Sequence, residues 1–140
     1  MHLSQIKIEN FRIFKECTVG FLPGLNLIVG ENDSGKSALV DGIKLVLGTL
    51  SNDWIRIDDS DFYDDVDAFV ISCTLKSISQ EEAAFFLEWL SFDDQNEFYL
   101  KITLRARKSS TVKPFYTIHA GADEDSGVLQ GEAKEKLRVT

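Results

Sequence analysis

"GENDSGKSALVDGIKLVLG", residues 30–48, is the stretch that decides the fold. Its first eight residues match the pattern G-x-x-x-x-G-K-[S/T], with Gly30, Gly35, Lys36 and Ser37 at the fixed positions. Glycines allow a loop to curl until several backbone N–H groups converge on a polyphosphate. In such a loop Lys36 meets the β- and γ-phosphates, and Ser37 offers its hydroxyl to Mg²⁺.

The residues around this motif predict the secondary structure that a phosphate-binding loop needs. The aliphatic run "LNLIV", residues 25–29, predicts a buried strand before the loop. After the loop, apolar residues recur at helical spacing and a glycine fits the helix C-cap: Leu39, Val40, Ile43, Val46, Leu47 and Gly48. The helix would present its N-terminal N–H groups to an anion. A glycine-rich turn that only caps a helix is the simpler alternative.

The rest of the chain reads mainly as strands. Alternating apolar residues predict strands over residues 3–9, 17–21, 69–75 and 98–106, with residues 113–120 as a hairpin partner of the last. Pro23-Gly24 is a turn signal. Ser79 and Glu82 form a capping box that predicts a helix to about Leu90. Residues 49–67 are too polar and interrupted for continuous regular structure, and residues 132–140 predict a short helix and the start of a strand.

Composition bounds the class of protein. The chain has 140 residues, 44% of them hydrophobic, which suffices for one domain with a core. A net charge of −8 argues against a surface that attracts DNA or anionic lipid by charge alone. Cys17 and Cys73 have no metal-binding spacing and are predicted to be buried thiols of a reduced compartment. Since no leader and no long apolar run is visible, we expect a cytoplasmic protein that does not associate with membranes.

Residues 6–48, which contain "IKIENFR" and the phosphate-loop motif, resemble the N-terminal lobe of ABC-type ATPases of the SMC and RecF class. The variant "GENDSGKS", followed by "SNDWIRIDDSDFYDD", is more similar still to the OLD family of ATP-dependent endonucleases. The similarity runs to about residue 75 and continues more weakly to "EKLRVT". It implies an α/β P-loop NTPase fold, an incomplete ABC-type ATPase lobe with an antiparallel β layer. Residues 1–140 would be its N-terminal portion, without the Toprim nuclease domain that follows in OLD proteins.

The same resemblance assigns a site. Arg12, in "NFR", corresponds to an arginine that contacts phosphate or base, although a surface arginine after a strand is the plain alternative. The cofactors would be ATP and Mg²⁺, with Ser37 as the protein's Mg²⁺ ligand. The implied cofactor-binding residues are Arg12, Gly30, Asn32, Asp33, Ser34, Gly35, Lys36, Ser37 and Ala38. The resemblance implies that the active form is a head-to-head dimer with ATP bound between the two protomers. We therefore expect a homodimer or a complementary chain, with nucleic acid as the partner of the full-length protein, in DNA repair or phage defence.

ATP hydrolysis needs more than a phosphate-binding loop. An acidic residue should end an aliphatic strand, hold Mg²⁺ through water and stand beside a base for the attacking water. After the loop, "AFVISC" ends in neutral residues and "FYLKITLRAR" in basic ones, and the family's signature sequence is missing. We therefore expect ATP and Mg²⁺ binding without hydrolysis or DNA cleavage by this chain alone. A small self-sufficient P-loop kinase or NTPase, and a nucleotide-binding regulatory fragment, remain as alternatives.

Two charged clusters have ordinary interpretations. An acidic cluster lacks the glycine and glutamate of a calcium loop and is interpreted as a solvated loop; its members are Asp58, Asp59, Asp61, Asp64, Asp65 and Asp67. A basic strand face could contact a phosphate backbone, yet a solvated face is the simpler interpretation; it comprises Lys101, Arg105, Arg107 and Lys108. Without a neighbouring strand, the edge of "LNLIV" would be apolar and unpaired, which predicts association with another chain.

Overall fold

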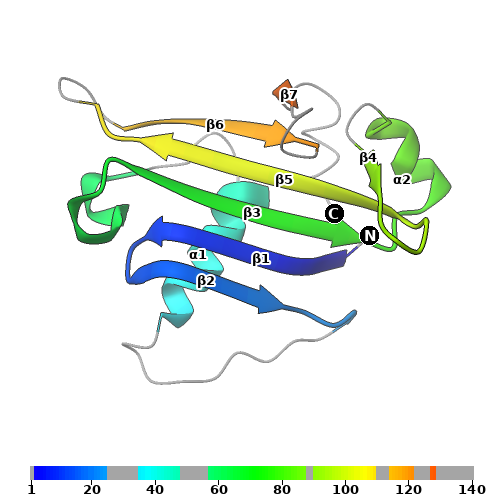
Figure 1. Ribbon diagram of the computed structural model, residues 1–140, viewed down its shortest axis with the longest axis horizontal. Helices are drawn as coiled ribbons and strands as arrows, with labels where there is room; N and C mark the ends of the chain where they lie inside the picture. The colour runs from blue at the N-terminus through cyan, green and yellow to red at the C-terminus, as the bar shows by residue number, and fades with distance from the viewer. Residues whose placement is uncertain are drawn as a thin grey trace.

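The protein, seen in a computed structural model, is built on one antiparallel sheet with a helix across one face (Figure 1). The structure describes residues 2–24, 35–47, 57–87, 90–109, 114–121 and 127–128. The seven strands have the order β2-β1-β3-β5-β6-β7, and β4 pairs with β5. Their bounds are β1 His2–Phe11, β2 Phe14–Gly20, β3 Ala68–Lys76, β4 Leu90–Phe92, β5 Phe98–Arg107, β6 Phe115–Ala120 and β7 Gly127–Val128.

Strict alternation along β3 and β5 explains why these two strands form the centre of the sheet. Phe69, Ile71 and Cys73 of β3 are buried on the face that α1 (Lys36–Leu47) covers, while the residues between them are half-buried. On β5, Leu100, Ile102 and Leu104 are fully buried on the same face, and Ile71 pairs directly with Leu104. The predicted strands over residues 3–9, 69–75 and 98–106 are confirmed, as is the hairpin partner, which is β6.

Gly42 lies where α1 packs against the sheet. The buried face of α1 is formed by Ala38, Leu39, Gly42, Leu45 and Val46, spaced at one and two helical turns. A Cβ built at Gly42 would lie 3.5 Å from Cδ1 of Ile71 and 3.6 Å from Cδ1 of Ile8, which is ordinary contact. The predicted helix is confirmed, but its buried face is turned by about one residue, so that Val40, Ile43 and Leu47 are only half-buried.

Two predictions need correction, and one strand was not predicted. The helix opened by Ser79 is α2, Gln80–Phe85, and it ends well before Leu90 because Phe86 turns into the core and is fully buried. Residues 90–92 then pair with the start of β5 as β4, a strand that the sequence pattern did not indicate. Cys73 is buried as predicted, whereas Cys17, on β2, is only partly buried.

Several predicted features lie outside the described residues. They are the strand over residues 25–29 with its apolar edge, the cap at Gly48 and the elements over residues 132–140. The turn at Pro23-Gly24 is described, and Gly24 has φ +90°.

Candidate nucleotide-binding site

The end of the phosphate-loop motif is fitted against the turn between β1 and β2. Gly35 has φ +88°, a conformation that glycine adopts without strain. A Cβ there would lie 2.6 Å from Cζ of Phe14 and 2.8 Å from Cδ1 of Ile13. The second fixed glycine of the motif is therefore required twice, by its backbone conformation and by the packing of two side chains.

Lys36 and Ser37 begin α1 immediately after this glycine. The first helical hydrogen bond of the segment runs from the amide of Leu39 to the carbonyl of Gly35, at 2.9 Å. The amides of Lys36, Ser37 and Ala38 consequently lie in the first turn, where N–H groups have no partner within the helix. The side chain of Ala38 is buried, so any contact of this residue with a ligand is through its backbone.

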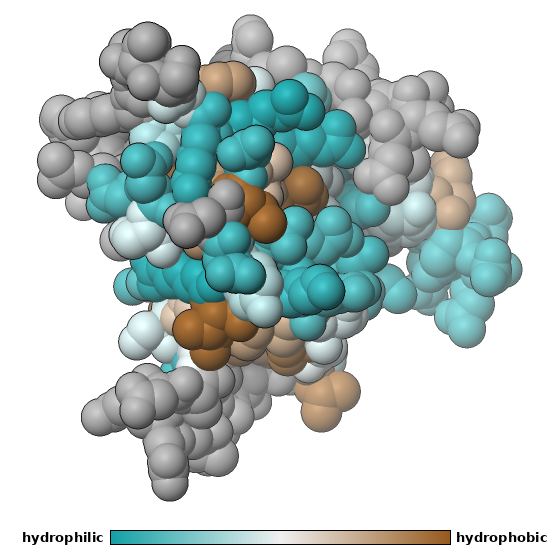
Figure 2. Space-filling model, turned by 60° about the vertical axis from the view of Figure 1, so that its left-hand side comes forward, coloured by the Kyte–Doolittle hydropathy of each residue, from teal (hydrophilic) through white to brown (hydrophobic). Residues whose placement is uncertain are grey.

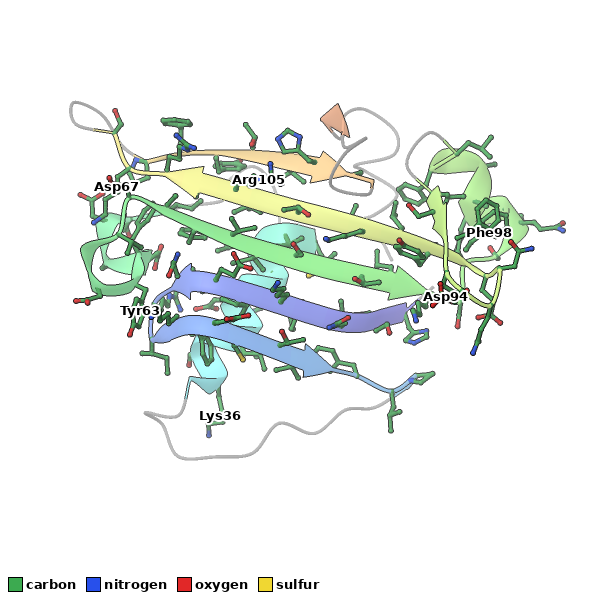
Figure 3. The ribbon with its side chains drawn as sticks, in the orientation of Figure 1. Lys36, Tyr63, Asp67, Asp94, Phe98 and Arg105 are labelled. Carbon is green, nitrogen blue, oxygen red and sulfur yellow. The ribbon has the colours of Figure 1, made fainter. Side chains whose placement is uncertain are left out.

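An open hollow lies along the first two turns of α1. It has a volume of about 330 Å³ and is lined by Lys36, Ser37, Val40, Asp41 and Lys44. In Figure 3 the side chain of Lys36 points away from the sheet at the end of the helix. The first turn carries no acidic residue, so no carboxylate competes there with an anionic ligand for the helix N-terminus. Gly30, Asn32, Asp33 and Ser34 lie outside the described residues.

Arg12 lies in the turn between β1 and β2, with φ +52°. Its Nε donates to Oδ1 of Asp61 at 3.0 Å, and its Nη1 donates to Oδ2 of Asp41 at 2.6 Å. Its guanidinium carbon is also 5.0 Å from the centre of the Phe11 ring. The backbone amide of Arg12 donates to the carbonyl of Asp61 at 2.8 Å. Arg12 thus joins three parts of the molecule: the β1–β2 turn, α1 and the 3₁₀ turn η1 (Asp59–Asp61).

Asp61 corrects the interpretation of the acidic segment as a solvated loop. It is only 7% exposed, and its Oδ2 accepts the backbone amide of Asp58 at 3.0 Å while its Oδ1 meets Arg12. Burial acts to lower the pKa of the Arg12 guanidinium, but hydrogen bonds and charge attraction from Asp41 and Asp61 outweigh it and raise that pKa. The ion pairs therefore keep a positive charge fixed beside the first turns of α1.

The remaining charged residues of the two clusters differ in exposure. Asp58, Asp59, Asp64 and Asp67 are exposed, and within the described ranges no three His, Cys, Asp or Glu side chains are placed to hold a metal ion. On β5, Arg105 and Arg107 are exposed on the face opposite α1. The same face is not uniformly solvated, because Thr103 between Lys101 and Arg105 is 3% exposed. Its hydroxyl lies 3.2 Å from that of Ser72.

Sequence reasoning missed Asp41 and Asp61 as parts of this site. One signal was available: Asp41 follows Ser37 by four residues and so lies on the same face of the helix. A second was the spacing of Asp58 and Asp61, which allows a reciprocal cap of a short turn. Neither signal identifies Arg12 as the shared partner, because that contact joins residues 29 and 49 positions apart.

The long described strands that follow α1 do not end in an acidic residue. The long ones, β3, β5 and β6, end in Lys76, Arg107 and Ala120, and all of them pair antiparallel. Figure 2 turns the end of the sheet with the β1–β2 turn toward the viewer, and this end is mainly hydrophilic with small apolar areas. The geometry is that of a polar ligand site without a complete hydrolytic centre among the described residues.

The antiparallel sheet joined to a phosphate-loop helix is the fold of an α/β P-loop NTPase. It corresponds to an incomplete lobe of an ABC-type ATPase. The chain belongs to the AAA domain family, whose model matches residues 5–137.

Two curated relatives are similar to this chain over a short segment. The DNA double-strand break repair Rad50 ATPase of Pyrococcus abyssi is 49% identical over 43 residues, which cover 31% of this chain and 5% of that protein. The DNA repair protein RecN of Bacillus subtilis is 40% identical over 55 residues, or 39% of this chain and 10% of RecN. The chain therefore matches only a small fraction of the length of these relatives.

Solved structures share the fold over nearly the whole chain. An SMC ATPase studied for ATP-driven dimerization and DNA-stimulated activation aligns with a TM-score of 0.57 and 18% identity, covering 99% of this chain and 76% of that chain. The recombination mediator RecF with ATP aligns with a TM-score of 0.57 and 21% identity, covering 94% of this chain and 29% of RecF. Neither helix described here is long and apolar enough to cross a membrane.

Proposed function

We propose that this chain is the ATP- and Mg²⁺-binding lobe of an ATPase that acts on nucleic acid. The observation that carries the proposal is the start of α1, where the phosphate-loop motif ends and Lys36 and Ser37 line an open hollow. A triphosphate in this hollow would receive N–H donors from the first turn and a point charge from Lys36. Gly30, Asn32, Asp33 and Ser34 would complete the loop around it.

Ser37 and Arg12 have separate proposed roles. The exposed hydroxyl of Ser37 suits Mg²⁺, a hard cation that takes oxygen ligands and keeps several waters beside phosphate oxygens. Arg12 would contact the phosphates, since Asp41 holds its guanidinium one helical turn beyond Ser37. In this proposal ATP and Mg²⁺ bind at the same end of α1.

The family-level proposal concerns the whole protein. Residues 1–140 would be the N-terminal portion of an ABC-type ATPase domain in an OLD-like ATP-dependent endonuclease, on the strength of "GENDSGKS" and "SNDWIRIDDSDFYDD". Dimerization driven by ATP and activation by DNA, as studied for the related SMC ATPase, would then apply here as a homodimer or an assembly with a complementary chain. A cytoplasmic location, with a role in DNA repair or phage defence, belongs to the same proposal.

Three measurements on the purified chain test the nucleotide part. MgATP should raise the melting temperature, because a ligand that binds only the folded state stabilises it. Phosphate release should stay at background, and sedimentation with and without ATP should show whether ATP drives association. Sustained hydrolysis would contradict the expectation that this chain does not hydrolyse ATP alone, and phosphate transfer to a small acceptor would favour a kinase instead.

The endonuclease part is tested by the genomic reading frame that encodes this chain. An aliphatic strand ending in Asp-Glu, followed by a Toprim-like acidic pattern, would support the OLD-like assignment. A reading frame that contains neither feature would overturn it.

A further inference from the structure

Two carboxylates hold different edges of the Arg12 guanidinium. Oδ1 of Asp61 accepts a hydrogen bond from Nε at 3.0 Å, and Oδ2 of Asp41 accepts one from Nη1 at 2.6 Å. A guanidinium has five N–H donors in a fixed plane. Within the described part of the chain, the other three N–H groups of Arg12, including both on Nη2, have no hydrogen-bond partner.

The held guanidinium lies close to the hollow at the start of α1. Asp41 is four residues after Ser37, so the two side chains are neighbours on one helix face, about 5–6 Å apart at Cβ. Asp41 itself lines the hollow with Lys36 and Ser37. The unused edge of Arg12 is therefore within reach of an anion that sits on these residues.

The two holders differ in character. Asp61 is fixed, because its side chain is 10% exposed and a backbone amide binds its second oxygen. Asp41 is 41% exposed at its side chain, and its charge borders the hollow. Asp61 is thus the anchor of Arg12, while Asp41 sets the direction of the guanidinium toward α1.

We infer that Asp61 and Asp41 are positioning residues of the nucleotide site, which fix Arg12 so that its remaining N–H groups meet a phosphate group of the bound nucleotide. The inference rests on the proposed ATP-binding function. A long arginine side chain loses rotamer freedom when it binds a ligand, and prior fixation removes this cost from the binding step. In this proposal the two carboxylates act on the nucleotide through Arg12.

The test is a double-mutant cycle on ATP affinity, measured by isothermal titration of the chain with MgATP. Asp61→Asn keeps the size of the side chain but removes the charge that anchors Arg12. It should weaken ATP binding about tenfold, the worth of one charge-assisted hydrogen bond. In an Arg12→Gln background the same substitution should change the affinity less than about twofold, because the arginine through which Asp61 acts on the ligand is already absent. Asp59→Asn, an exposed neighbour on the same 3₁₀ turn, is the matched control and should bind as wild type does.

Equal weakening by Asp61→Asn in both backgrounds would overturn the inference, because it would mean that Asp61 supports the fold in general. An unchanged affinity in the wild-type background would also overturn it. If Asp61→Asn does not fold, Arg12→Lys decides the question. A lysine ammonium has three donors instead of a planar set of five, so it cannot hold both carboxylates and still present three N–H groups in a fixed plane. This variant should bind ATP about tenfold more weakly, and wild-type affinity would refute the positioning role.

The failure of the proposed function gives a different pattern. If the wild-type chain binds no ATP, or if Lys36→Ala binds ATP as well as wild type does, both the function and this inference fall. If the wild-type chain binds ATP and Lys36→Ala does not, the proposed function stands. The double-mutant cycle at Arg12 and Asp61 then decides the inference alone.

Discussion

A Cβ atom at Gly35 would lie 2.6 Å from Cζ of Phe14, well inside normal contact. The phosphate-loop motif and the β1–β2 turn are therefore packed together, although Gly35 and Phe14 are far apart in the chain. The consequence is that the glycine pattern of the loop is a packing requirement as well as a conformational one.

Gly35→Ala should destabilise the fold by about 2–5 kcal/mol, the sum of about 1–2 for a left-handed alanine and about 1–3 for overpacking. Urea unfolding of the purified variant measures the loss. Gly24→Ala is the control, because Gly24 has φ +90° but a Cβ there meets no atom within 4 Å. The control should show the conformational cost alone, and equal losses at the two positions would contradict the packing argument.

Gly42→Ala should have the opposite effect. A Cβ at Gly42 meets Ile71, Ile8 and Phe11 at 3.5–3.8 Å, which is ordinary van der Waals contact. Alanine is favoured over glycine inside a helix by about 1 kcal/mol, so the free energy of unfolding should rise by up to that amount. The shift of the urea midpoint checks this, and a loss of stability would contradict it, since the contacts at this position leave room for a methyl group.

Cys73 makes a prediction about alkaline pH. Burial raises the pKa of its thiol from 9.0 to about 12. Above pH 9 the unfolded chain releases this proton while the folded protein keeps it, so stability falls as pH rises between the two values. The loss is about 1.4 kcal/mol for each pH unit in that window. We expect the advantage of wild type over Cys73→Ala, measured by urea unfolding at pH 8 and pH 10, to shrink accordingly. An advantage that is constant with pH would refute the burial of this thiol.

Much of the fold could be predicted because its signals are local. Alternation at Ile71 and Cys73 marks β3, and the capping box of Ser79 and Glu82 marks the start of α2; both signals lie within a few residues of the structure they predict. The end of α2 could not be predicted, because it depends on the burial of Phe86 and on the pairing of β4 with β5, which are tertiary contacts.

The candidate site divides in the same way. Lys36 and Ser37 follow from a motif whose chemistry is contained in eight consecutive residues. The resemblance to known ATPases drew attention to Arg12 but said nothing of its partners. Asp41 and Asp61 come from separate elements, and only folding brings them to one guanidinium. Composition made Asp61 look like one of several solvated carboxylates, because local sequence does not record which of them faces inward.

The most direct test of the central claim is the affinity of MgATP for the wild-type chain and for two lysine variants, measured by equilibrium dialysis. Lys36 and Lys44 line the same hollow on the same helix, but only Lys36 belongs to the phosphate-loop motif. We predict that Lys36→Ala weakens ATP binding about a hundredfold, while Lys44→Ala changes it less than about threefold. Equal effects of the two substitutions, or no binding by the wild-type chain, would contradict the account.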